Sequence, residues 1–184
     1  MDLAAFTDAV IAYCKHNQNI IPFIVFLIGF IKSLAVISIL VPGVIILVAI
    51  GALSAASGIS LWPLVIADGF GAMLGYALSY WVGLSYSDTI LHWKIFARHP
   101  VAINRTHAFF NKYGSLAVFL GHFFGPVRAF IAIIAGINSM RALPFHIANI
   151  TSSFLWSFGV LAPSYYGVST GFFGAIQSFM KSIF

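Results

Sequence analysis

The stretch "GHFFGPVRAF", residues 121–130, places a helix breaker, Gly125-Pro126, and one arginine, Arg128, inside a long apolar segment. Arg128 is the only Lys, Arg, Asp or Glu between Lys112 and Arg141. A proline within a helix removes a backbone hydrogen bond and breaks or kinks it. An arginine at the centre of a bilayer costs about 2.5–3.5 kcal/mol on insertion scales, so it normally faces a partner or a wet cavity. In a membrane protein, the stretch therefore predicts two half-helices that meet at a functional break.

The composition indicates an integral membrane protein. Of the 184 residues, 61% are hydrophobic and only 7% are charged, whereas soluble surfaces carry roughly 25–35% charged residues. The net charge of +5 indicates anionic lipid headgroups as neighbours, and no basic-aromatic motif indicates a nucleic-acid surface. Residues 1–19 lack a signal-peptide pattern and are expected to form a surface helix that stays on the protein.

Two apolar segments have the length of one membrane crossing, which needs about 20 residues. They are Leu61 to Val82 and Leu143 to Val168. Ile20 to Ile31 is shorter and is expected to continue slightly beyond these limits. The sequence therefore predicts an all-α polytopic membrane protein.

Two further segments suit neither one crossing nor two. Residues 34–67 are uncharged and interrupted by Pro42-Gly43, and residues 115–140 are interrupted by Gly125-Pro126. Half a crossing needs about 10 residues at 1.5 Å per residue. Two half-helices meeting at a breaker fit each segment, which predicts re-entrant hairpins at 33–58 and 115–140.

The two halves of the chain match each other in order, at an offset of 81 to 85 residues. This favours an internal duplication, in which broken helices at corresponding positions indicate a transport site near the bilayer midplane. It predicts one membrane domain, 20–184, with repeat one at about 20–83, a connector at 84–112, repeat two at about 113–168 and a C-terminal segment at 169–184. The matches are "SLAV" at 33–36 and 115–118, Pro42-Gly43-Val44 with Gly125-Pro126-Val127, Gly51 with Gly136, "LWPLVIAD" (61–68) with "ALPFHIAN" (142–149), and "SYWVG" (79–83) with "SYYG" (164–167).

The connector sets the expected orientation. It carries Lys94, Arg98, Arg105 and Lys112, and the positive-inside rule places such a loop in the cytoplasm. If 61–82 crosses once and 34–58 is re-entrant, the first hairpin enters from outside and the N-terminus is expected to be cytoplasmic too. The hairpins then enter from opposite faces, which makes the repeat inverted.

Arg128 and Asp68 are the main candidates for binding chemistry. The guanidinium fork of arginine matches phosphate oxygens, and half-helix ends add unpaired N–H groups for an anion. Alternatively, Arg128 snorkels to an interface or pairs with Asp68. Asp68 is the only acid within 61–82; it can take up a proton, coordinate an ion, counter Arg128, or act as a simple charge at a helix N-terminus.

Three other polar residues accompany these candidates. His122 precedes Arg128 by six residues and is either a titrating partner near neutral pH or a neutral, hydrogen-bonded side chain. Asn149 is expected to join helices by hydrogen bonding. Lys32 is expected to snorkel towards an interface.

An enzyme is not expected. The chain contains no G-x-S-x-G and no Glu. The connector histidines lack the i, i+4 spacing of a zinc site on a helix. No metal or other cofactor is therefore expected.

Four stretches together resemble the DedA family, the bacterial branch of the VTT (SNARE-associated) superfamily, over about residues 20 to 170. The resemblance implies opposed re-entrant hairpins with spanning helices in the bacterial cytoplasmic (inner) membrane. It also implies transbilayer movement of a phospholipid or of polyprenyl phosphate, in some members coupled to protons. The stretches are "PGVIILVAIGAL" (42–53), "GFGAMLGYALSYWVG" (69–83), "FFNKYGSLAVFLGHFFGPVRAFIAIIAGINSM" (109–140) and "PFHIANITSSFLWSFGVLAPSYYG" (144–167).

The chain departs from the family pattern at several positions. Arg128 matches the family's functional arginine, but His122 stands where a second arginine is expected, and the Pro-Gly order is reversed at 125–126. Lys32 and Val44 stand where the family has acids, and Gly75-Tyr76 where it has Gly-Asp. The resemblance thus implies a divergent member, with Asp68 and His122 as replacements for the missing carboxylates.

These observations predict a multi-pass lipid transporter, a flippase or scramblase, that holds a phosphate headgroup between its hairpins. Protons are candidate coupling ions, and a homo-oligomer is compatible with the sequence. A proton- or ion-coupled small-solute transporter and a non-transporting envelope assembly protein are the alternatives. The expected substrate-binding residues are Arg128, His122, Asp68, Pro42, Gly43, Gly125, Pro126 and Asn149.

Overall fold

The computed structural model describes the helical body of the protein. Pro42, one of the predicted breakers, lies outside the described residues, as do most of the predicted surface helix and most of the connector. The described residues are 16–34, 43–87, 109–110 and 112–169, with the single positions 12 and 89.

Every regular element in these ranges is a helix, which confirms the all-α prediction. Prolines lie in the first turns of four helices, where a missing N–H removes no hydrogen bond: Pro22 of α2, Pro63 of α4, Pro126 of α9 and Pro144 of α10. Gly125-Pro126 therefore starts a helix, and the break itself is the turn at residues 122–124. The helices are α2 (Ile21–Ile31), α3 (Gly43–Ala56), α4 (Leu61–Ser85), α8 (Ser115–Gly121), α9 (Gly125–Ile137) and α10 (Ala142–Ser169).

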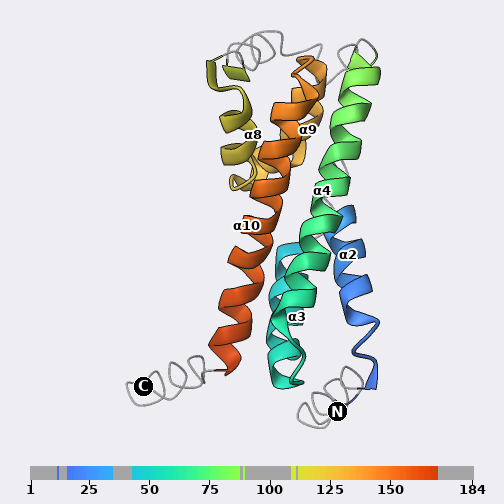
Figure 1. Ribbon diagram of the computed structural model, residues 1–184, viewed down its shortest axis with the longest axis vertical. Helices are drawn as coiled ribbons and strands as arrows, with labels where there is room; N and C mark the ends of the chain where they lie inside the picture. Colours follow the sequence, from blue (N-terminus) through green and yellow to red (C-terminus); the bar gives the residue numbers. More distant parts are fainter. Residues whose placement is uncertain are drawn as a thin grey trace.

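The helices α4 and α10 are long and apolar enough to cross a bilayer. With 25 and 28 residues, they confirm the two long helices predicted at 61–82 and 143–168. They pack against each other and run in opposite directions along the whole molecule (Figure 1).

The other four helices are short and occupy opposite halves of the molecule. α2 and α3 lie along the lower half of the long helices, and α8 and α9 along the upper half (Figure 1). At 1.5 Å per residue they are roughly 10 to 21 Å long, against roughly 38 to 42 Å for the long pair. The end of α2, the start of α3, and the turn between α8 and α9 all lie near mid-height (Figure 1).

This arrangement differs from the sequence prediction in one respect. The predicted first hairpin began at residue 33, whereas α2 is already a half-length helix that ends near mid-height at Ile31. Glycines of α4 allow this close position, because a Cβ at Gly71 or Gly75 would collide with the backbone of Phe26 or Phe30 in α2. The first broken pair is therefore α2 with α3.

The second short helix of each half packs against the long helix of the other half. α3 packs on α10, and α9 packs on α4. In α3, a Cβ at Gly51 would collide with Ser164 of α10; in α9, a Cβ at Gly136 would collide with the carbonyl oxygen of Tyr80 in α4. These two glycines are the ones that the repeat alignment pairs with each other.

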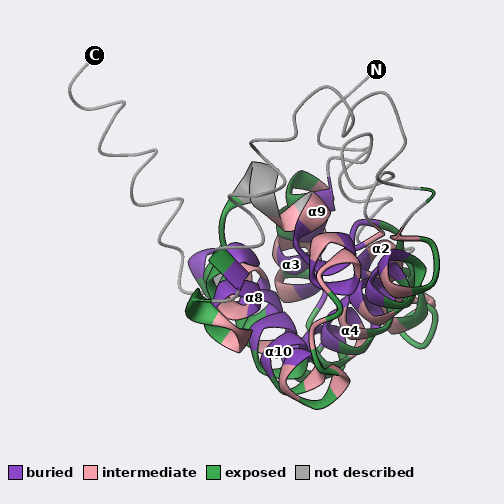
Figure 2. Ribbon diagram, turned by 90° about the horizontal axis from the view of Figure 1, so that it is seen from above, coloured by how far each residue is buried: buried purple, intermediate pink, exposed green. Residues whose placement is uncertain are grey.

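Large apolar side chains cover the outside of the molecule. On α4, Ile66, Phe70, Leu74 and Leu78 follow one another at intervals of four residues and are all 44–47% exposed. Seen from above, buried residues face the shared centre and exposed residues face outwards (Figure 2). Such a surface fits a hydrocarbon environment, since soluble monomers rarely expose contiguous apolar patches of this extent.

Candidate functional site

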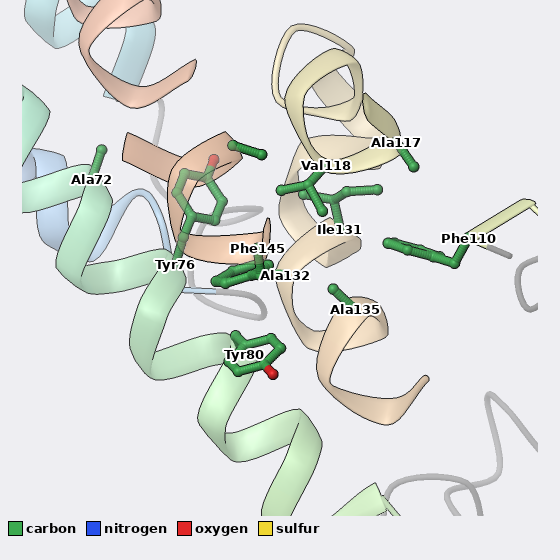
Figure 3. Packing of buried hydrophobic residues seen from close by; sticks show 11 residues of the cluster. Ala72, Tyr76, Tyr80, Phe110, Ala117, Val118, Ile131, Ala132, Ala135 and Phe145 are labelled. Atoms are coloured by element: carbon green, nitrogen blue, oxygen red, sulfur yellow. The ribbon is translucent and has the colours of Figure 1, made fainter. Parts of the chain in front are cut away.

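Buried polar side chains form a layer between two apolar cores. The upper core joins Ala72, Tyr76 and Tyr80 of α4 to Phe145 of α10 and to side chains of α8 and α9 (Figure 3). The lower core is built mainly from α2, α3 and the opposite ends of α4 and α10. Between the two cores, α4 contributes Asp68 and α10 contributes buried Asn149, Ser152, Ser153 and Ser157, so the layer lies where the short helices break.

Lys32 and Asp68 form an ion pair within this layer. The Lys32 ammonium donates to both carboxylate oxygens of Asp68, each at 2.8 Å. The Ser157 hydroxyl of α10 donates to Asp68 Oδ2 at 2.5 Å. Lys32 is 2% exposed and Asp68 0%, so the prediction that Lys32 snorkels is wrong: its ammonium finds its counter-charge inside the protein.

Asp68 lies well inside α4, as the eighth residue of that helix. The interpretation as a simple charge at a helix N-terminus is therefore wrong, because the dipole effect falls off within the first turn. Gly29 of α2 makes room for its carboxylate, since a Cβ there would lie 2.7 Å from Asp68 Oδ1. The chain then passes from α2 directly to Lys32.

Arg128 lies in the first turn of α9, and this helix begins near the mid-height of the molecule (Figure 1). Its guanidinium carbon is 4.6 Å from the ring centroid of Trp156 in α10. Asp68 is the only acid within the described ranges, and it pairs with Lys32. The alternative in which Arg128 pairs with Asp68 is therefore not what the structure has, and the Arg128 side chain is only partly buried.

Trp156 brings the two cations together. The Lys32 ammonium lies 3.9 Å from the centroid of the ring that Arg128 also contacts. Cations bind the faces of tryptophan rings by electrostatic attraction, and both cations lie within 4.6 Å of the centroid of the Trp156 ring. One side chain of α10 thus holds a cation from each half of the molecule.

His122 lies in the turn after α8 and is 2% exposed. Its Nδ1 is 3.0 Å from the Ser152 hydroxyl, and its ring centroid is 4.3 Å from that of Tyr76. These contacts describe a buried, hydrogen-bonded histidine that fastens the turn to α10 and α4.

Asn149 joins the two long helices, as predicted. Its side-chain amide donates to the carbonyl oxygen of Met73 in α4 at 3.0 Å, and its oxygen accepts from Ser153 at 3.2 Å. Gly43 begins α3 against Lys32, where a Cβ would lie 2.9 Å from the lysine Cβ. Thus Asn149 belongs to the layer, and Gly43 borders it.

Sequence reasoning missed several members of the layer. Lys32 was interpreted as an interfacial residue, and Tyr76, Trp156 and the serines were not candidates. One signal was present: in α10, polar residues and the tryptophan recur at i, i+3, i+4, i+7 and i+8, which is one face of a helix. The members of this face are Asn149, Ser152, Ser153, Trp156 and Ser157.

Within the described residues, the layer holds two cations, Lys32 and Arg128, and one carboxylate, Asp68. Among all the described residues, no three His, Cys, Asp or Glu side chains lie close enough together to bind a metal ion.

A separate groove of about 390 Å³ lies between α8 and α10, and its lining is mostly apolar. Residues 115, 116, 119, 143, 144, 147, 148 and 151 line it.

Comparisons with known proteins agree on one family. The VTT domain model matches residues 41–166. The chain is 27% identical to the uncharacterized membrane protein BU139 of Buchnera aphidicola over 80% of its length and 57% of the relative's. It is 25% identical to inner membrane protein YabI of Escherichia coli, covering 72% of the chain and 52% of YabI. Undecaprenyl phosphate transporter A of Staphylococcus aureus is 29% identical, covering 66% and 63%.

The chain thus spans little more than half the length of the first of these relatives. No solved structure matches it.

Proposed function

The chain belongs to the VTT domain family of membrane proteins, and from this membership and the polar layer we propose that it moves a phosphate-bearing lipid across the bacterial inner membrane. In this proposal the headgroup binds at Arg128, and the protein acts as a flippase or scramblase rather than an enzyme. The observation that carries the proposal is Arg128 itself: a partly exposed cation at a helix break, with no carboxylate partner among the described residues.

Two features around Arg128 support an anionic headgroup. Its guanidinium can donate two parallel hydrogen bonds to phosphate oxygens. It also lies in the first turn of α9, where the helix dipole attracts negative charge. Asp68 and Asn149 hold the neighbouring helices in place, and the chains of the lipid would lie against the exposed apolar surface.

A polyprenyl phosphate and a phospholipid are the two candidate substrates. The relative named undecaprenyl phosphate transporter A favours the first. Both present phosphate oxygens to the same guanidinium, so the site recognises their shared chemistry. Protons remain candidate coupling ions in this proposal.

We also propose that α2 with α3, and α8 with α9, are opposed re-entrant hairpins of an inverted repeat. Their half lengths and their reciprocal packing on α10 and α4 support this. With the basic connector in the cytoplasm, α2 begins on the opposite side, because the start of α2 and the end of α4 lie at opposite ends of the molecule (Figure 1). The predicted cytoplasmic position of the N-terminus concerns residues outside the described ranges.

Lipid translocation in proteoliposomes tests the proposal. Wild-type protein should move a fluorescent phosphate-bearing lipid between leaflets, and Arg128→Ala should abolish the movement while the helical content stays unchanged. Arg141→Ala is the matched control, because Arg141 is exposed and precedes α10 outside the layer, and it should translocate like the wild type. Translocation by Arg128→Ala at the wild-type rate would refute the proposal. Transport of a soluble substrate without lipid movement would favour the solute transporter instead.

A further inference from the structure

Lys32 lies beside Arg128 in the polar layer. Its ammonium and the Arg128 guanidinium contact the same Trp156 ring, so the two cations are close neighbours. They come from opposite halves of the molecule, Lys32 directly after α2 and Arg128 at the start of α9. A headgroup bound at Arg128 would therefore lie beside Lys32.

Asp68 already presents to Lys32 what a phosphate would present. Both of its carboxylate oxygens accept from the ammonium at 2.8 Å, and two adjacent anionic oxygens are also the edge of a phosphate group. A lysine ammonium has three N–H donors, and two of them point to Asp68. An incoming phosphate must share or take these donors.

The charge balance of the layer favours such competition. Within the described residues, Lys32 and Arg128 carry two positive charges against the single negative charge of Asp68. The surplus of one positive charge attracts an anion, and the anion gains most if it contacts both cations. Ser157 still donates to Asp68 Oδ2, so the carboxylate keeps a partner when Lys32 turns to phosphate.

We propose that Lys32 is a second ligand for the phosphate headgroup and that Asp68 is a resident counter-ion that competes with phosphate for it. This rests on the proposed function, since it names how that same site recognises its substrate. The empty site is then neutralised in part by the protein itself, which lowers the cost of keeping Lys32 buried while no lipid is bound. The competing idea is a purely structural ion pair, in which Lys32 never leaves Asp68.

Binding of one lipid probe separates these ideas. The probe is dioleoyl phosphatidic acid, titrated into purified full-length protein in dodecyl maltoside micelles, which contain no phosphate. Dioleoylglycerol, which has the same chains and no phosphate, is the control ligand. The fluorescence change that is lost in Trp156→Phe reports occupancy of the layer.

Two variants are expected to shift the affinity for phosphatidic acid in opposite directions. Asp68→Asn should tighten binding of phosphatidic acid by about tenfold, because Lys32 is released and a hydrogen bond to a charged group is worth that much. Lys32→Met/Asp68→Asn leaves the net charge of the layer unchanged and no buried charge unpaired. It should bind about tenfold more weakly than the wild type, because the second ligand is gone. If Asp68→Asn does not fold, the double variant still decides the question.

A structural ion pair predicts different results. Unchanged affinity in the double variant would overturn the proposal, and so would an Asp68→Asn protein that folds and binds no tighter. A failure of the proposed function would be distinguishable, because Arg128→Ala would then still translocate lipid. Loss of translocation in Arg128→Ala with unchanged binding in the double variant would refute only the role of Lys32.

Discussion

The two cations of the polar layer differ in how they are satisfied. Lys32 is almost completely buried, bound to both oxygens of Asp68 and backed by Ser157. Arg128 is partly exposed and rests on Trp156. The residue that follows α2 thus carries a neutralised positive charge, and the first turn of α9 carries one that is only partly buried.

The two cations should therefore differ in how much their removal destabilises the folded protein. A buried ion pair contributes little net stability but is costly to break on one side, because the remaining charge stays buried without a partner. A partly exposed cation on an aromatic ring can be removed at small cost. Changes around Lys32 should therefore act on folding as well as on substrate binding, whereas changes at Arg128 should act mainly on the substrate.

Removal of the Asp68 carboxylate should give the largest effect. Asp68→Ala leaves Lys32 buried and unpaired, and we expect it to lower the free energy of unfolding by about 3–5 kcal/mol. Arg128→Met should lower it by less than about 1 kcal/mol. Equilibrium unfolding in mixed micelles of dodecyl sulfate and dodecyl maltoside measures both, and equal losses in the two variants would contradict the distinction.

The hydrogen bond from Ser157 to Asp68 should matter to a smaller extent. Ser157→Ala removes a donor to a charged, buried oxygen, and we expect a loss of about 1.5–3 kcal/mol. Ser164→Ala is the matched control, since that hydroxyl donates only to carbonyl oxygens of its own helix. The same unfolding measurement applies; a Ser157→Ala loss no greater than that of the control would show that Asp68 does not depend on this hydroxyl.

The corresponding contact on the Arg128 side should be the weakest of the three. Ser152→Ala removes the hydrogen bond to His122, and we expect a loss of about 0.5–1.5 kcal/mol, the usual contribution of one hydrogen bond. Unfolding of Ser152→Ala beside Ser157→Ala measures the difference directly. If Ser152→Ala lowered the free energy of unfolding more than Ser157→Ala, the hydrogen bond of His122 would contribute more to stability than the hydrogen bond of Asp68, against this expectation.

The lengths of the apolar segments and the positions of helix-breaking residues were enough to predict much of the fold. The apolar lengths predicted α4 and α10, and the breakers predicted short helices in both halves. The position of α2 was harder to predict, because it depends on glycines of α4 that face it only after folding. Sequence length alone could not show that α2 stops at mid-height.

The polar layer was only partly predictable for a similar reason. Arg128 and Asp68 stand out because each is a single charge in an apolar segment. Which cation pairs with Asp68 is a long-range choice, made between Lys32 and Arg128 by the packing of α2 on α4. The helical spacing of the polar residues from Asn149 to Ser157 does indicate one polar face of α10 from the sequence alone.

In the proposed function, Arg128 holds a phosphate headgroup in the layer. Native mass spectrometry of wild type and Arg128→Met, each extracted from its own membrane into dodecyl maltoside, measures whether it does. We expect the wild type to retain phosphate-bearing lipid and Arg128→Met to lose it while remaining folded. Retention of the same lipids in the same amounts by both proteins would contradict it.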